Sequence, residues 1–168
     1  MDTNTHRCVA FKIVGHVVVY DNYYTSPALA AELLAKGIHT IGTLRSNRQS
    51  VCSEIKTWGK KNCDNAGVKL SRGDYVVYES AVPGLPSQKM YLVSWFDNKI
   101  VRMLCTTPLK EGCVRRRILT ETGRGAAKVA AWSRVPVTCP TSVTVYNSKM
   151  GGVDAHDQAL SYFPLKLQ

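Results

Sequence analysis

Apolar and polar positions in the first part of the chain follow the order strand, helix, strand. The uninterrupted β-branched run Val17–Tyr20 predicts a strand buried on both faces. Ser26 and Pro27 then supply a helix N-cap and a proline at the first helical position, and Gly37 is the expected stop. Residues 38–44 predict a second strand, which a helical crossover makes parallel to the first. The buried helix face is predicted to consist of Leu29, Ala30, Leu33 and Leu34.

The middle and the end of the chain give shorter patterns. Three further strands are predicted at 74–79, 89–95 and 100–105. Turns are expected between them at 84–87 and 97–98. The arginine-rich stretch 114–134 contains two glycines that argue against a helix, so a loop is predicted there. Residues 141–146 predict a last extended segment, and 153–162 a helix that follows two glycines.

The positive charge of the chain is concentrated in one segment. The 168 residues include 22 Lys and Arg against 12 Asp and Glu, a net charge of +10. Residues 45–134 hold 17 of the basic and seven of the acidic residues, so this segment carries the whole excess. Its densest cluster is Arg115, Arg116 and Arg117, followed by Arg124 and Lys128. Such an asymmetry favours nucleic acid as a partner, and the alternatives are a solvated face or a localisation signal.

Other features narrow the class of protein. No apolar run approaches the roughly 20 residues that cross a bilayer, and the first residues lack the pattern of a secretory signal, so a soluble intracellular protein without a membrane partner is expected. The six cysteines stand singly, which favours buried or idle thiols over a zinc site. The three tryptophans, Trp58, Trp95 and Trp132, are predicted to be packing anchors.

Three aspartates are candidates for metal chemistry. Asp21 follows the first predicted strand, where open α/β sheets collect ligands. Asp154 and Asp157 lie one helical turn apart at the start of the last predicted helix. Brought together, these carboxylates would suit Mg²⁺ or Mn²⁺, and two such ions can promote phosphodiester cleavage. Alternatively, Asp21 forms a turn, and the other two aspartates complement the helix dipole.

Three segments of the sequence resemble the piggyBac transposase family. The first is Val-Tyr-Asp-Asn-Tyr-Tyr-Thr-Ser-Pro at 19–27, with the helix after it. The second is Gly-Thr-Leu-Arg-Ser-Asn-Arg at 42–48, and the third is the 146–158 segment, which includes Met-Gly-Gly-Val-Asp. Shorter similarities occur at 95–99 and at Pro136. The resemblance covers residues 15–163 in the family's order.

The resemblance implies an α/β fold, namely a partial RNase H-like transposase core that is interrupted by a β-rich insertion. Residues 1–44 would then be the first part of the core and 45–134 the basic insertion that faces DNA. Residues 135–168 would return to the core with the helix that bears the aspartates. The insertion would coincide with the segment that carries the net charge of +10.

The resemblance also implies roles for individual residues. Asp21 is similar to the second catalytic aspartate of the family, Asp154 to the third, and Asp157 to a further carboxylate one turn on. Asp21 and Asp154 would bind Mg²⁺ or Mn²⁺. The candidate DNA contacts are Arg45, Arg48, Arg115, Arg116, Arg117, Arg124 and Lys128.

The chain also departs from the family pattern. Nothing before Asp21 resembles the strand that carries the first catalytic aspartate, and that strand's absence would leave 17–20 with an open edge. We therefore expect a nuclear DNA-binding remnant of a transposase, inactive by itself and without a small-molecule substrate. The alternative is a working strand-cutting enzyme of which this chain is a fragment or one subunit, completed by a second copy or a related transposase chain.

Overall fold

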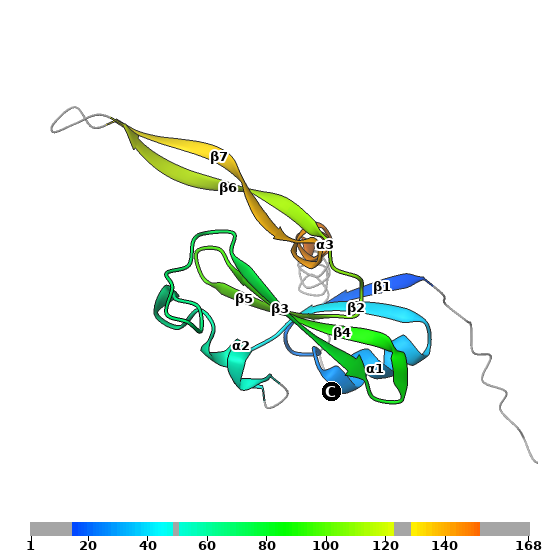
Figure 1. Ribbon diagram of the computed structural model, residues 1–168. Helices are drawn as coiled ribbons and strands as arrows, with labels where there is room; N and C mark the ends of the chain where they lie inside the picture. The colour runs from blue at the N-terminus through cyan, green and yellow to red at the C-terminus, as the bar shows by residue number, and fades with distance from the viewer. Residues whose placement is uncertain (1–14, 49–50, 123–128, 152–168) are drawn as a thin grey trace, which may run out of the picture.

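A five-stranded mixed sheet forms the body of the protein. The computed structural model describes residues 15–48, 51–122 and 129–151. The strands, in their order across the sheet, are β1 (His16–Tyr20), β2 (Ile38–Thr43), β5 (Ile100–Cys105), β4 (Leu85–Phe96) and β3 (Tyr75–Val82). A separate two-stranded ribbon, β6 (Glu111–Thr122) with β7 (Val129–Pro140), extends away from this body (Figure 1).

The predicted β–α–β unit is confirmed. β1 and β2 are parallel, with Tyr20 opposite Gly42. The helix between them, α1 (Pro27–Ala35), begins at Ser26, whose Oγ accepts a hydrogen bond from the Leu29 backbone N–H at 3.2 Å. It ends before Gly37, whose φ of 78° is the left-handed conformation that closes helices. The local signals at both helix ends therefore act as predicted.

Both faces of the sheet are covered, but by different elements. On one face, α1 buries Ala30 and Leu34 against three residues of the sheet strands, Val82, Met90 and Leu104. The short helix α2 (Ser53–Thr57) packs Ile55 on the same side with Leu44 and Val51, and a 3₁₀ turn, η1 (Lys60–Asn62), follows it. On the opposite face lie the base of the hairpin and α3 (Thr141–Lys149) (Figure 1).

The strand β1 is less buried than predicted. It lies at one edge of the described sheet, with only β2 beside it. Val17 and Val18 are 44% and 39% exposed, so the prediction of burial on both faces is wrong. An uninterrupted apolar run gives the same sequence pattern in a central strand with both faces buried and in an edge strand with one neighbour. Only the tertiary context distinguishes the two cases.

Two other predictions of secondary structure are wrong. The stretch 114–134, predicted as a loop, lies largely in β6 and β7, which pair from Glu111–Pro140 to Thr122–Val129. The segment 141–146, predicted as extended, lies in α3. Its β-branched residues suggest a strand, but Val143 is buried in the core against the sheet, and packing outweighs weak intrinsic propensity. The helix predicted at 153–162 lies outside the described residues.

The three strands predicted in the middle of the chain are confirmed, and they complete the same sheet. β2 pairs antiparallel with β5, with Ile41 opposite Cys105 and Gly42 opposite Leu104. The hydrogen-bonded sheet therefore continues across the boundary predicted at residue 44. The turn between β3 and β4 lies at Pro83–Gly84, slightly earlier than predicted.

Two cysteines belong to the core. Cys105 and Cys139 are fully buried, and burial raises the pKa of Cys105 to about 12 and that of Cys139 to about 11. Both thiols therefore stay protonated at neutral pH, as expected of structural cysteines. Within the described ranges, no helix has the length and apolar character to cross a membrane.

Gly42 is required for close packing at the end of the β–α–β unit. A Cβ atom there would lie 2.6 Å from Cε2 of Tyr20 and would also collide with the hydroxyl of Thr25. We predict that Gly42→Ala lowers the free energy of unfolding by about 1–3 kcal/mol, because overpacking forces these groups apart. Urea denaturation measures the change.

The matched control for this prediction is Gly112→Ala. Gly112 is also a strand glycine, but a Cβ there would meet Thr144 Cγ2 at 3.4 Å, an ordinary contact. Its effect should stay within about 0.5 kcal/mol. Equal destabilisation by the two substitutions would show that the loss of stability does not come from the collision with Tyr20 and Thr25.

Candidate functional site

Asp21 lies immediately after β1, at the carboxyl end of the two parallel strands. Its Oδ1 accepts a hydrogen bond from the Tyr23 N–H at 2.8 Å, and its backbone carbonyl accepts one from the Thr25 hydroxyl at 2.7 Å. The carboxylate thus holds the turn that leads into α1, as the turn interpretation predicts. It is also only half-buried, so the same group remains accessible to a ligand.

A groove lies beside this turn. Arg48, from the segment after β2, donates from Nη2 to the carbonyls of Asn22 and Tyr23, both at 3.0 Å. It thereby ties the ends of the two parallel strands together. The groove has a volume of about 810 Å³ and is lined by Tyr23, Ser26, Pro27, Ala28, Arg45, Asn47 and Arg48. Arg45 is exposed, so the groove has a basic rim.

Helix α3 packs against the same end of the sheet. The hydroxyl of Tyr146 lies 3.4 Å from the hydroxyl of Thr43, the last residue of β2. Tyr20 and Gly42 are opposite one another in the parallel pair, so Asp21 and Thr43 occupy equivalent positions at the strand ends. Asp154 and Asp157 follow α3 in the chain, but they lie outside the described residues.

The described residues supply only part of a divalent-metal site. No group of three or more His, Cys, Asp or Glu side chains in ranges 15–48, 51–122 and 129–151 could hold a metal ion. Asp21 has the oxygen ligands that Mg²⁺ and Mn²⁺ prefer, but one carboxylate does not by itself make such a site. The chemistry of Asp21 fits the predicted ion, and the other predicted ligands belong to the part that is not described.

The second candidate surface is the β6–β7 hairpin. Successive side chains of a strand point to opposite sides, so the three consecutive arginines of β6 are divided between the two sides of the hairpin. Arg116 faces the sheet, where its Nε donates to Asp97 Oδ2 at 2.9 Å and its guanidinium lies 5.6 Å from the Trp95 ring centroid. Asp97 is also ion-paired with Arg72, and its side chain is only 15% exposed. Arg116 is therefore an anchor of the hairpin.

The indole of Trp95 strengthens the same anchor. Trp95 is 1% exposed, and its Nε1–H donates to the carbonyl of Thr138 in β7 at 2.8 Å. Together, Trp95 and Asp97 at the end of β4 hold one strand of the hairpin each. These two contacts determine which side of the hairpin faces away from the sheet.

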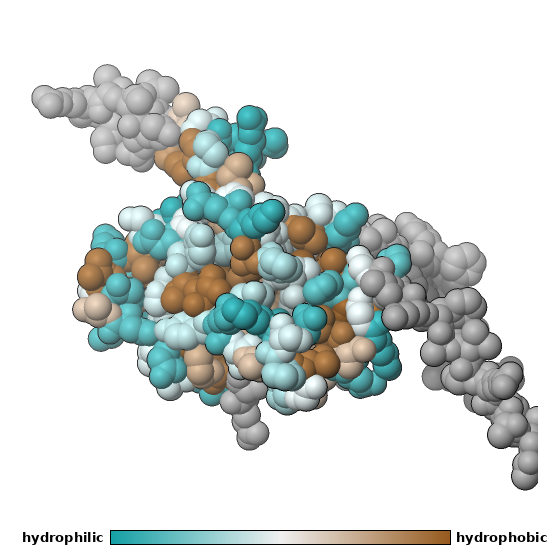
Figure 2. Space-filling model, turned by 45° about the vertical axis from the view of Figure 1, so that its right-hand side comes forward, coloured by the Kyte–Doolittle hydropathy of each residue, from teal (hydrophilic) through white to brown (hydrophobic). Residues whose placement is uncertain are grey.

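The outward side carries basic and aromatic residues. Arg115, Arg117, Trp132 and Arg134 are all exposed and share this side, since Arg117 is opposite Arg134 and Arg115 is opposite Pro136. The guanidinium of Arg117 lies 5.2 Å from the Trp132 ring centroid. Hydrophilic and hydrophobic residues are seen next to each other on the projecting hairpin in Figure 2. Arg124 and Lys128 lie outside the described residues.

Trp132 is a functional candidate that the sequence reasoning missed. The prediction of packing anchors is confirmed for Trp58 and Trp95, which are 5% and 1% exposed, but it is wrong for Trp132, which is 61% exposed. The signal that could have found it is spacing, because Trp132 and Arg134 are two residues apart and therefore share one side of a strand.

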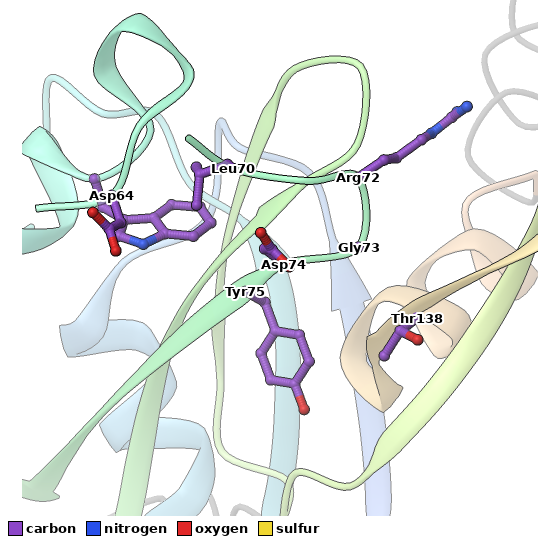
Figure 3. Close-up of a pocket in the computed structure, with 8 residues that line it drawn as sticks. Asp64, Leu70, Arg72, Gly73, Asp74, Tyr75 and Thr138 are labelled. Carbon is purple, nitrogen blue, oxygen red and sulfur yellow. The ribbon is translucent and has the colours of Figure 1, made fainter. Parts of the chain in front are cut away.

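A further hollow, of about 500 Å³, lies between the 58–75 segment and Thr138 (Figure 3). Its two carboxylates serve local turns. Asp64 accepts from the N–H groups of Ala66 and Val68, and Asp74 accepts from that of Ser71. Figure 3 shows Arg72 pointing away from this hollow, consistent with its ion pair to Asp97. The polar groups of the hollow are therefore explained by the fold.

Comparison with known families identifies the class of protein. Residues 8–168 match the family described as Transposase IS4, and the chain belongs to this family. The resemblance to piggyBac transposases is confirmed by a curated human protein, PiggyBac transposable element-derived protein 2. The two are 29% identical over 158 residues, which is 90% of this chain but 22% of the human protein. No solved structure matches the chain.

The anchor at Asp97 predicts unequal roles for neighbouring arginines. We expect Arg116→Met to lower the free energy of unfolding by about 1–3 kcal/mol, because it removes a charged hydrogen bond and the contact with Trp95. Arg115→Met, the matched control on the exposed side, should change it by less than about 0.5 kcal/mol. Urea denaturation would contradict this assignment if the two variants were equally stable.

Proposed function

We propose that this transposase-like domain binds DNA through the outward side of the β6–β7 hairpin. The observation that carries the proposal is the division of the arginines. Arg116 is used to hold the hairpin in place, whereas Arg115, Arg117 and Arg134 are exposed on the other side. Among the side chains that the structure describes, which leave out those of 120–130, none of these three arginines has a carboxylate within ion-pair distance.

The electrostatics of the hairpin favour an anionic partner. Arg117 and Arg134 are directly opposite one another across the two strands, and like charges in that position repel. A phosphate between them would turn the repulsion into two attractive contacts, since a guanidinium binds phosphate oxygens in a planar, two-pronged way. A two-stranded ribbon is also narrow enough to enter the DNA major groove, which is about 12 Å wide.

The remaining basic candidates contribute less or are placed differently. Arg45 lines the groove at the strand ends and is exposed, so it is a second point of phosphate contact. Arg48 uses part of its guanidinium to bind two backbone carbonyls, and Arg116 is held by Asp97. Arg124 and Lys128 stand between β6 and β7 in the sequence, and we keep them as candidate contacts.

A second candidate function is metal-dependent strand cutting. It is favoured by the position of Asp21 at the strand ends toward which α3 packs through Tyr146. We propose that Asp21 and Asp154 hold Mg²⁺ or Mn²⁺, with Asp157 as a third carboxylate. The ions would activate water and stabilise the leaving oxygen of a phosphodiester. The protein itself would orient Asp21 by the Tyr23 hydrogen bond and hold the two strand ends together through Arg48.

Among the described strands, β1 lies at an edge of the sheet, which is consistent with a sheet that continues in another segment. Val17 and Val18 are partly exposed on this edge strand, and an unpaired edge is a template for a further strand. We propose that a second copy or a related transposase chain, acting in the nucleus, supplies it. For the organisation of the chain, we propose that residues 1–44 and 135–168 form the core of the transposase and that 45–134 form the insertion. The strands β3, β4 and β5, which lie within 45–134, belong to the same sheet as β1 and β2.

DNA binding by the hairpin predicts a specific change in salt dependence. Changing Arg115, Arg117 and Arg134 together to Ala should weaken binding to a DNA duplex and reduce the slope of log K against log salt by about 2–3, because three phosphate contacts are lost. Fluorescence anisotropy with a labelled duplex at several salt concentrations measures both quantities.

The control for this experiment removes the same amount of charge elsewhere. Lys60, Lys61 and Lys69 are exposed and lie on the segment around η1, which is not part of the hairpin. Their triple change to Ala should alter the slope by less than about 1. If both triple variants reduced the slope equally, the effect would be one of net charge, and the hairpin would not be the DNA-binding surface.

The metal proposal predicts a loss of thermal stabilisation in Asp21→Asn. An Asn oxygen can still accept the Tyr23 hydrogen bond, so the turn is kept while the charge is lost. Millimolar Mn²⁺ should raise the unfolding temperature of the unaltered chain by several degrees, and that of Asp21→Asn by none. Asp64→Asn, whose side chain serves a comparable turn, is the control and should respond like the unaltered chain. An undiminished response of Asp21→Asn excludes this aspartate as a ligand.

A further inference from the structure

The outer part of the hairpin presents an aromatic ring that is not packed into the core. Trp132 is 61% exposed, and the residue opposite it in β6, Leu119, is 44% exposed. Burying a tryptophan is among the larger sources of stability available to a domain of this size. Trp132 instead stands on the side of the ribbon that faces away from the sheet, next to the arginines proposed to bind phosphate.

The surroundings of the indole are those of a mixed aromatic and cationic surface. The guanidinium of Arg117 lies 5.2 Å from the ring centroid, and Arg134 lies two residues along the same strand, on the same side. In this arrangement, the guanidinium of Arg117 lies over one face of the indole, and Arg134 adds positive charge on the strand that carries the ring. Aromatic rings for stacking and arginines for the backbone are the two elements by which proteins bind unpaired nucleotides.

From this arrangement, and resting on the proposed DNA binding, we propose that Trp132 stacks on an unpaired base of a DNA strand while Arg117 and Arg134 bind its phosphates. Paired bases within a groove expose their edges, and an indole cannot stack on an edge. The ring therefore selects a segment whose bases are unpaired, either single-stranded DNA or an opened duplex. The class of ligand is thus narrower than DNA in general.

The test compares three labelled probes of the same length: an oligothymidylate strand, a strand of abasic deoxyribose phosphates, and a duplex. Trp132→Ala should weaken binding to the oligothymidylate between about 5-fold and 100-fold. It should change the affinity for the abasic strand and the duplex less than about 2-fold, because their phosphates meet the same arginines. Trp132→Phe, which keeps a ring, should recover most of the loss.

The tryptophan fluorescence gives an independent readout. Trp58 and Trp95 are buried, so quenching by added oligothymidylate reports mainly on Trp132 and should disappear in Trp132→Ala. Equal affinity of Trp132→Ala and the unaltered chain for the oligothymidylate overturns the stacking proposal. Equal losses on all three probes also overturn it, because Trp132 would then only support the hairpin.

Two further outcomes separate this inference from the proposed function. If the triple arginine variant loses duplex binding but Trp132→Ala changes nothing, the hairpin binds DNA and the stacking role is wrong. If no probe binds the unaltered chain, both proposals fail together. A dimer that Trp132→Ala converts to monomer in sedimentation, with unchanged affinity for all probes, assigns the ring to a protein contact and overturns the inference.

Discussion

The carboxylate of Asp97 lies between two guanidinium groups, and this arrangement decides which side of the hairpin faces outward. Arg72 reaches it from the segment before β3, and Arg116 reaches it from β6. A carboxylate that is only 15% exposed requires such partners, because an unpaired buried charge is costly. Trp95, two residues earlier in β4, binds the other strand of the hairpin through Thr138. The end of β4 and the turn after it thus orient a ribbon of two twelve-residue strands.

The two candidate surfaces depend on different parts of the same sheet. The parallel pair β1 and β2 brings Asp21, Arg45 and Arg48 to one end, as expected for the carboxyl ends of strands in an α/β fold. The end of β4 and the turn that joins it to β5 carry the anchor for the hairpin. Membership of the transposase family gives both surfaces a common context, in which we propose metal ligands for the first surface and DNA contacts for the second. The hairpin's exposed tryptophan would further restrict which DNA is held.

Features with local causes were predictable from the sequence, and those with tertiary causes were not. Ser26, Pro27 and Gly37 define the ends of α1 through contacts within a few residues, so the β–α–β unit was predicted correctly. The arginine cluster was recognised, but its division was not, because assigning the stretch to a loop removed the two-residue alternation that turns Arg116 inward. The exposure of Trp132 and the helical state of 141–149 both depend on distant packing. Asp154 and Asp157 remain predictions from the resemblance.

The most direct measurement is a DNA titration followed by NMR of the arginine Nε–H and tryptophan Nε1–H groups. Arg115, Arg117, Arg134 and Trp132 should shift on addition of DNA with an unpaired segment, because their side chains form the exposed side of the hairpin. Arg116 and Trp95 should not shift, because Asp97 and Thr138 hold them against the sheet. Large shifts of Arg116 and Trp95, or shifts confined to Arg45 and Arg48, would contradict the orientation and role assigned to the hairpin.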